Sequence, residues 1–160
     1  MPHTTFHHLL EDFTKSVGLD IEVPSADNLE SFEFTYEGTR CVVRPAGDAT
    51  HVIIDADVLR LDTLPIIRRS QALRLLHGVN LAAHATNHLV VMLDVDEEIR
   101  ISKNLLLSGL TASALADEMV SAIEAAQSLA RSLQILGRAE EAPAGETAPA
   151  PAVPCPLQIA

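Results

Sequence analysis

The spacing of apolar residues changes from helical to alternating and back along this chain, and this change limits its possible folds more than any other feature does. Near the N-terminus, apolar side chains recur every three or four positions, as on one face of an amphipathic helix: Phe6, Leu9, Leu10, Phe13 and Val17. We expect a helix from about Thr5 to Val17, with Thr4 or Thr5 as its N-cap and Gly18 as its C-terminal stop. The chain should therefore begin with a helix that has one apolar face.

The next readable segment has a period of two. Aromatic residues alternate with polar ones there, which is typical of a half-buried strand: Phe32, Phe34 and Tyr36. Two more strands, about Arg40–Arg44 and Thr50–Leu59, follow the turn sequences Glu37-Gly38 and Pro45–Asp48. Strands joined by such short turns predict a three-stranded antiparallel meander.

A second helix is predicted from Pro65 to about His84, because proline is favoured in the first turn of a helix. Its apolar residues form two stripes, one with Ile66, Leu73, Leu76 and Asn80 and the other with Ile67, Leu75 and Ala82. A helix that is apolar on more than one side usually packs against more than one partner. The sheet can be one partner, and a second subunit can be the other.

Two strands and a long helix complete the pattern. The strands are predicted at His88–Asp94 and about Glu98–Leu106. The first contains LVVMLDV, whose nearly continuous apolar character indicates a strand covered on both faces. The last helix should start near Thr111 or Ser113 and continue to about Leu136. The predicted fold class is α+β: a helix, a three-stranded antiparallel meander, a helix, two strands and a long C-terminal helix, with helices flanking a twisted sheet.

The last 23 residues differ in composition from the rest of the chain. Five of the nine prolines fall there, among alanine and glutamate. Such a segment cannot bury enough apolar surface to order itself. We therefore predict one domain over residues 1–137 and a disordered tail over residues 138–160.

The balance of charge argues against nucleic-acid binding. The 22 acidic residues outnumber the 11 basic ones, which gives a net charge of −11 that repels phosphate backbones. The first 15 residues lack the basic start and unbroken apolar run of a signal peptide, and no apolar segment is long enough to span a bilayer. Two cysteines far apart in the sequence do not indicate a disulfide framework. We expect a cytoplasmic protein that does not insert into membranes.

No motif for catalysis, cofactor binding or metal binding is present. The sequence lacks GxSxG, a phosphate-binding glycine loop and HExxH. His3 and His7 lie one helical turn apart, as do His84 and His88, but no cysteine or glutamate completes either pair at a recognised ligand spacing. Cys41 lies among apolar residues and arginines in a predicted strand, where a buried thiol is the commoner case. We therefore expect no catalytic residue, no metal and no cofactor.

Three segments resemble the class I type III secretion chaperones, the Tir-chaperone-like family. They are the opening FHHLLEDFTKSVGLD, the central LRLLHGVNLAAH leading into HLVVMLDV, and the terminal LADEMVSAIEAAQSLARSL. In this family an apolar helix with a Leu-Leu pair and an asparagine leads into a strand, and Leu75, Leu76 and Asn80 occupy those places here. The resemblance covers about Phe6–Leu136 and includes no catalytic motif.

The resemblance implies a homodimeric cytoplasmic chaperone that binds the N-terminal region of a secreted effector and keeps it stable and competent for secretion. Binding would use apolar residues of the first helix and the sheet, together with strand addition at a sheet edge; the candidates are Phe6, Leu10, Phe32 and Phe34. The candidate dimer interface comprises Leu73, Leu76, Val90, Val91 and Leu93. Two alternatives remain open, a binding module of the same fold in another pathway and a small cysteine-dependent enzyme.

Overall fold

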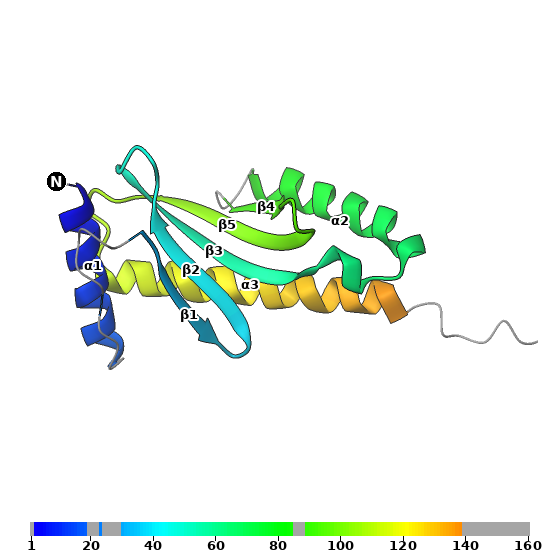
Figure 1. Cartoon of the computed structure of the whole chain (residues 1–160), viewed down its shortest axis with the longest axis horizontal. Coiled ribbons are helices and arrows are strands. Elements are labelled where there is room, and N and C mark those ends of the chain that lie inside the picture. Colours follow the sequence, from blue (N-terminus) through cyan, green and yellow to red (C-terminus); the bar gives the residue numbers. More distant parts are fainter. Residues whose placement is uncertain (1, 19–22, 24–29, 85–88, 139–160) are drawn as a thin grey trace, which may run out of the picture.

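A five-stranded antiparallel sheet forms the centre of the protein (Figure 1), whose computed structural model describes residues 2–18, 23, 30–84 and 89–138. The strand order is β1-β2-β3-β5-β4. The strands are β1 (Phe32–Tyr36), β2 (Thr39–Pro45), β3 (His51–Arg60), β4 (Leu89–Leu93) and β5 (Glu98–Leu106). The helices are α1 (Pro2–Val17), the short 3-10 helix η1 (Leu61–Thr63), α2 (Ile66–His84) and α3 (Ala112–Arg138). The predicted α+β fold and its order of elements are confirmed.

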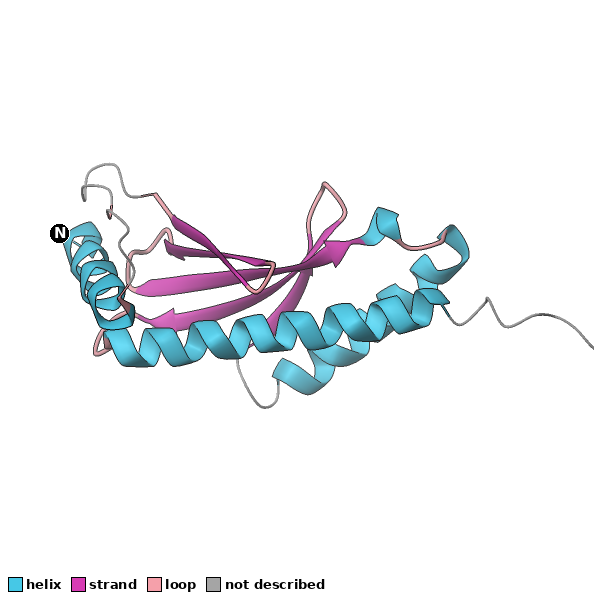
Figure 2. Cartoon of the chain, turned by 90° about the horizontal axis from the view of Figure 1, so that it is seen from below, coloured by secondary structure: helices cyan, strands magenta, loops and turns pink. Residues whose placement is uncertain are grey.

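The three helices take different positions around the sheet. The long helix α3 runs along one face of the sheet (Figure 2) and contacts β2, β3 and β5. Helix α1 packs against α3 at one end of the molecule, and α2 packs against the edge strand β4. The sheet therefore has one face covered by α3 and two different edges, β1 and β4.

The core lies between α3 and the sheet because alternate strand residues point toward the helix. Paired positions on this face are apolar, with Val43 opposite Ile54 and Ala56 opposite both Cys41 and Ile101. The apolar stripe of α3 supplies the other side of the core: Leu115, Met119, Ala122, Ile123, Ala126, Leu129 and Leu133. All of these residues are buried.

Two predicted chain reversals are confirmed by their backbone angles. Glu37 and Gly38 connect β1 to β2 with φ values of 48° and 79°, the left-handed pair that a two-residue hairpin turn requires. Gly18 follows α1 with a φ of 67°, and its N–H donates to the Lys15 carbonyl at 3.4 Å. Glycine suits both positions because it adopts positive φ without a Cβ penalty.

Some boundaries and one burial prediction are wrong. Helix α1 begins at Pro2, so neither Thr4 nor Thr5 is its N-cap, and α3 continues to Arg138. The strand β4 is not covered on both faces, because Val90 and Met92 are exposed. The predicted disordered tail, apart from Arg138 at the end of α3, lies outside the described residues.

Across the described part of the chain, no helix is both long enough and apolar enough to cross a membrane.

Candidate functional site

Helix α2 and strand β4 expose a group of large apolar side chains, which we call the α2–β4 surface. Its members are Ile66, Ile67, Leu73, Leu75, Leu81, Val90, Met92 and Leu93. Ile66 is 82% exposed and Leu81 is 67% exposed. Because only Ala72 and Leu76 are deeply buried among the α2 residues whose burial is described, 66–82, the helix keeps apolar residues on its solvent side as well. Exposed apolar groups of this extent are typical of protein–protein contact surfaces.

Asn80 closes the outer edge of β4. Its side-chain Nδ2 donates to the Val91 carbonyl at 2.8 Å, and its Oδ1 accepts from the Val91 N–H at 2.5 Å. The two hydrogen bonds occupy both outward backbone groups of Val91, which an added strand would otherwise use. The α2–β4 surface therefore offers side chains, and not a free strand edge at Val91, to a partner.

The opposite edge of the sheet is open. Strand β1 pairs with β2 and with no other strand among the described residues. A groove of about 450 Å³ lies next to it, between the β1–β2 turn and α3. Its lining combines apolar and polar side chains: Tyr36, Glu37, Val120, Ile123, Glu124, Gln127 and Arg131. Tyr36 is 52% exposed and Val120 is 48% exposed, so part of this apolar lining is accessible.

Ion pairs cover the sheet face that points away from α3. Arg40 donates to both Glu33 oxygens, at 2.6 and 2.8 Å, and to Asp57 at 3.3 Å. Arg100 joins the same network through Asp57, at 3.1 Å. The hydrogen bond from Arg40 lowers the pKa of Glu33 and raises the pKa of Arg40 itself. The network keeps these charges paired on an open sheet face.

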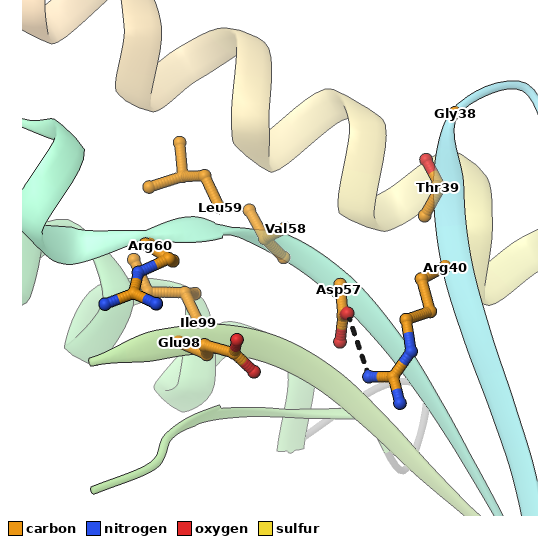
Figure 3. Close-up of a pocket in the computed structure, with 9 residues that line it drawn as sticks. All are labelled: Gly38, Thr39, Arg40, Asp57, Val58, Leu59, Arg60, Glu98 and Ile99. Carbon is orange, nitrogen blue, oxygen red and sulfur yellow. Dashed lines mark hydrogen bonds and ion pairs between the residues drawn. The ribbon is translucent and has the colours of Figure 1, made fainter. Parts of the chain in front are cut away.

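A small groove of about 210 Å³ lies beside this network, where β3 has a register shift between Asp57 and Leu59 (Figure 3). Arg40 and Asp57 point toward each other at one end of it, and Arg60 and Glu98 lie at the other end. The lining side chains include no Ser, Cys, His or Lys, and the two carboxylates among them, Asp57 and Glu98, form ion pairs with arginines.

Cys41 is a buried, unreactive thiol. Cys41 is fully buried, and this burial together with the nearby Asp55 and Asp57 carboxylates raises the pKa of its thiol to about 12. A thiol with this pKa stays protonated at neutral pH, whereas nucleophilic catalysis requires the thiolate. The flanking arginines do not lower the pKa, and this geometry argues against the cysteine-dependent enzyme.

The sequence profile of the Tir chaperone protein (CesT) family matches residues 8–130. The chain belongs to this family. Its members are type III secretion chaperones that bind effectors and are not enzymes. The match covers most of the described elements, from α1 to the greater part of α3.

Solved structures of such chaperones have the same fold as this chain. The crystal structure of the ExsC–ExsE complex is similar with a TM-score of 0.69 and 16% identity, over 82% of this chain and 95% of that one. The HopA1–SchA chaperone–effector complex gives a TM-score of 0.66 and 12% identity, over 81% and 95%. The Yersinia pestis type III secretion chaperone SycH, in complex with a fragment of YscM2, gives 0.59 and 19%, over 78% and 98%. No curated protein matches the chain.

The structure divides the predicted interface residues of this Tir-family chain into two groups. Leu73, Val90 and Leu93 are between 41% and 44% exposed and belong to the α2–β4 surface. Leu76 and Val91 are only 6% exposed each, because they fill the core of the single chain. These two side chains are therefore not available for contact with a second copy.

The predicted effector-binding residues are also mostly buried. Phe6 and Leu10 are fully buried and Phe32 is 4% exposed, so the assumption that they are accessible is wrong. Phe32 lies edge-on to Phe13 of α1, with ring centroids 6.3 Å apart, and therefore joins the helix to the sheet. Phe34 is half-buried. The helical period identified the buried face of α1 but not its partner, which is the chain's own core.

Sequence reasoning missed the groove beside β1 and the role of Asn80. Periodicity predicts only that Tyr36 lies in a strand and that Val120 lies in the last helix. Their exposure depends on where α3 crosses the sheet, which has no local signal in the sequence. Asn80 does interrupt an apolar stripe of α2 and precedes a strand, so a polar residue at this position was the available clue.

Proposed function

We propose that this chain is a cytoplasmic type III secretion chaperone that binds the N-terminal region of an effector as an extended segment and keeps it competent for secretion. Membership of the Tir chaperone family supports the class of function. The observation that carries the proposal for this chain is the open edge of β1 beside an accessible, partly apolar groove. An extended peptide needs both a backbone to pair with and places for its side chains.

The effector segment adds to β1 as a sixth strand. In a two-residue hairpin the flanking pair Tyr36–Thr39 is hydrogen-bonded, so alternate residues of β1 pair with β2. The backbone groups of Glu33 and Thr35 then point outward and are available to the segment. Its alternate side chains enter the groove next to Tyr36 and Val120. Of the four predicted effector-binding residues, Phe34 is the one that remains suitable for such a contact.

The α2–β4 surface forms the contact of a homodimer. It lies at the far edge of the sheet from β1, so the two functions do not compete for the same residues. A symmetric dimer buries the same patch of both copies, which suits exposed apolar side chains on two elements that pack against each other. Leu73, Val90, Met92 and Leu93 are the proposed contacts, because they are exposed and lie on the elements that meet at this edge.

The experiment that tests effector binding removes one outward N–H from β1. The partner is first identified by co-purification from the native cells, and an N-terminal fragment of it is then titrated. Thr35→Pro eliminates the outward donor but no hydrogen bond to β2, and proline is tolerated on edge strands. The matched control, Thr35→Ala, keeps the N–H. We expect at least tenfold weaker binding for the proline variant and little change for alanine.

Circular dichroism and size must first show that both variants are folded. Equal affinities of the two folded variants would refute strand addition at β1. If the co-purifying protein is not secreted by a type III system, the chain serves another pathway.

A further inference from the structure

Three side chains that can bind a metal lie together on the first turns of α1. They are His7, His8 and Glu11, and their ligand atoms all lie within 4.8 Å of one another. The His8 Nδ1 is 3.3 Å from the Glu11 Oε2, and the His7 Nδ1 is 3.9 Å from the same oxygen. The sequence spacing pairs His7 with His3, and no glutamate completes that pair at a recognised ligand spacing. In the helix, Glu11 is one turn from both His7 and His8 and so completes the set.

The geometry of this cluster is close to that of a zinc site. Bonds of about 2.0–2.2 Å to nitrogen and oxygen in a tetrahedral arrangement place neighbouring ligand atoms about 3.3–3.5 Å apart. The His8–Glu11 distance already has this value, the His7–Glu11 distance is 3.9 Å, and all three ligand atoms lie within 4.8 Å of one another. The two histidine rings lie next to each other, edge-on, with centroids 5.8 Å apart.

We propose that His7, His8 and Glu11 bind one Zn²⁺ ion, or another divalent transition metal of similar chemistry, with water as the fourth ligand. Two imidazoles and one carboxylate are a ligand set that zinc uses when it keeps a solvent position. Imidazole and carboxylate together favour Zn²⁺ over Mg²⁺ and Ca²⁺, which prefer ligand sets made of oxygen alone. This site is separate from the proposed effector groove and α2–β4 surface.

The cluster is open to solvent. The His8 Nδ1 and the Glu11 Oε2 lie within hydrogen-bond distance, and a metal ion would take the place of the proton between them. The His7 side chain is 16% exposed, whereas those of His8 and Glu11 are 66% and 37% exposed. The ion would therefore reach the cluster from solvent.

Metal binding at this place would stabilise α1 in its docked position. The ligands span one helical turn that also carries Leu9 and Leu10, whose side chains are in the core. An ion that binds the helical arrangement and not the unfolded chain raises the stability by mass action. At about 100 times Kd, the melting temperature should rise by roughly 5–10 °C for a chain of this size.

The test is calorimetric titration of the tag-free full chain with ZnCl₂ at pH 7.5, together with thermal unfolding. We expect one ion per chain at this site, with at least tenfold weaker binding in Glu11→Gln and in His8→Ala. Both variants change accessible side chains, so the fold should be kept, and circular dichroism checks this. The matched control is His77→Ala, an exposed histidine of α2, which should bind zinc as the parent does. His3→Ala tests whether the N-terminal histidine is responsible.

Two results would overturn the proposal. One is an absence of saturable zinc binding by the parent chain. The other is unchanged affinity in folded Glu11→Gln and His8→Ala, especially if His3→Ala or His77→Ala loses the ion. Loss in the two cluster variants, together with the disappearance of the zinc-dependent rise in melting temperature, supports the site and distinguishes it from adventitious binding to other histidines.

Discussion

Replacing Asn80 with alanine should separate α2 from the edge of the sheet. The substitution removes the two hydrogen bonds to the Val91 backbone, at 2.8 and 2.5 Å. Each such bond contributes about 0.5–1.5 kcal/mol net, so we expect a loss of about 1–3 kcal/mol in the free energy of unfolding. Urea denaturation at one fixed protein concentration measures this loss, and hydrogen exchange of the Val91 amide reports the same site directly.

The matched control is Asn104→Ala, which truncates an exposed asparagine of β5 in the same way. A substitution on the surface should change stability by no more than about 0.5 kcal/mol. Equal effects of the two substitutions, with unchanged exchange of the Val91 amide, would refute the argument that Asn80 joins α2 to β4.

Three further predictions concern burial. Glu118→Ala should lower the free energy of unfolding, measured with urea, by about 1–3 kcal/mol, because it leaves the buried Lys103 ammonium without its carboxylate. Lys103→Met should lower it less, and the opposite order of the two losses would contradict this reasoning. Leu73→Asp should halve the mass measured by light scattering while the fold is kept, but Leu76→Asp should unfold the chain. A folded Leu76→Asp monomer would show that the division into an exposed Leu73 and a core Leu76 is wrong. The pKa of the Cys41 thiol in the folded chain, about 12, lies above its ordinary value of 9.0, so between pH 9 and 12 only the unfolded thiol ionises. The free energy of unfolding should therefore fall as the pH rises through this range, and Cys41→Ala should make this fall less steep.

Periodicity predicted the elements well because each has one face that must be buried. The predicted strand Glu98–Leu106 has the same ends as β5, because Ile99 and Ile101 alternate with polar residues and a turn precedes it. The predicted first helix starts three residues later than α1, because Pro2–Thr4 has no apolar residue at a helical spacing. Local pattern therefore locates an element more reliably than its ends.

The candidate sites were harder to predict because they depend on contacts between distant segments. The aromatic residue Phe32 and the exposed Tyr36 belong to the same alternating strand, yet only the position of α1 makes one buried and the other accessible. The same limit applies to Leu73 and Leu76, which were assigned to one stripe of α2. An apolar residue that is buried in its own chain and one that is buried against a partner give the same pattern in a sequence.

The different treatment of the two sheet edges has a consequence for assembly. Sheets with two open edges can pair head to tail without limit, so that each copy adds a strand to the next and a fibre grows. Here one edge strand already has its central backbone groups bonded to Asn80, and the other does not. A copy that pairs through β1 therefore meets no matching edge at Val91 of the next copy. Head-to-tail growth, in which β1 of one copy pairs with β4 of the next, is therefore disfavoured at this position.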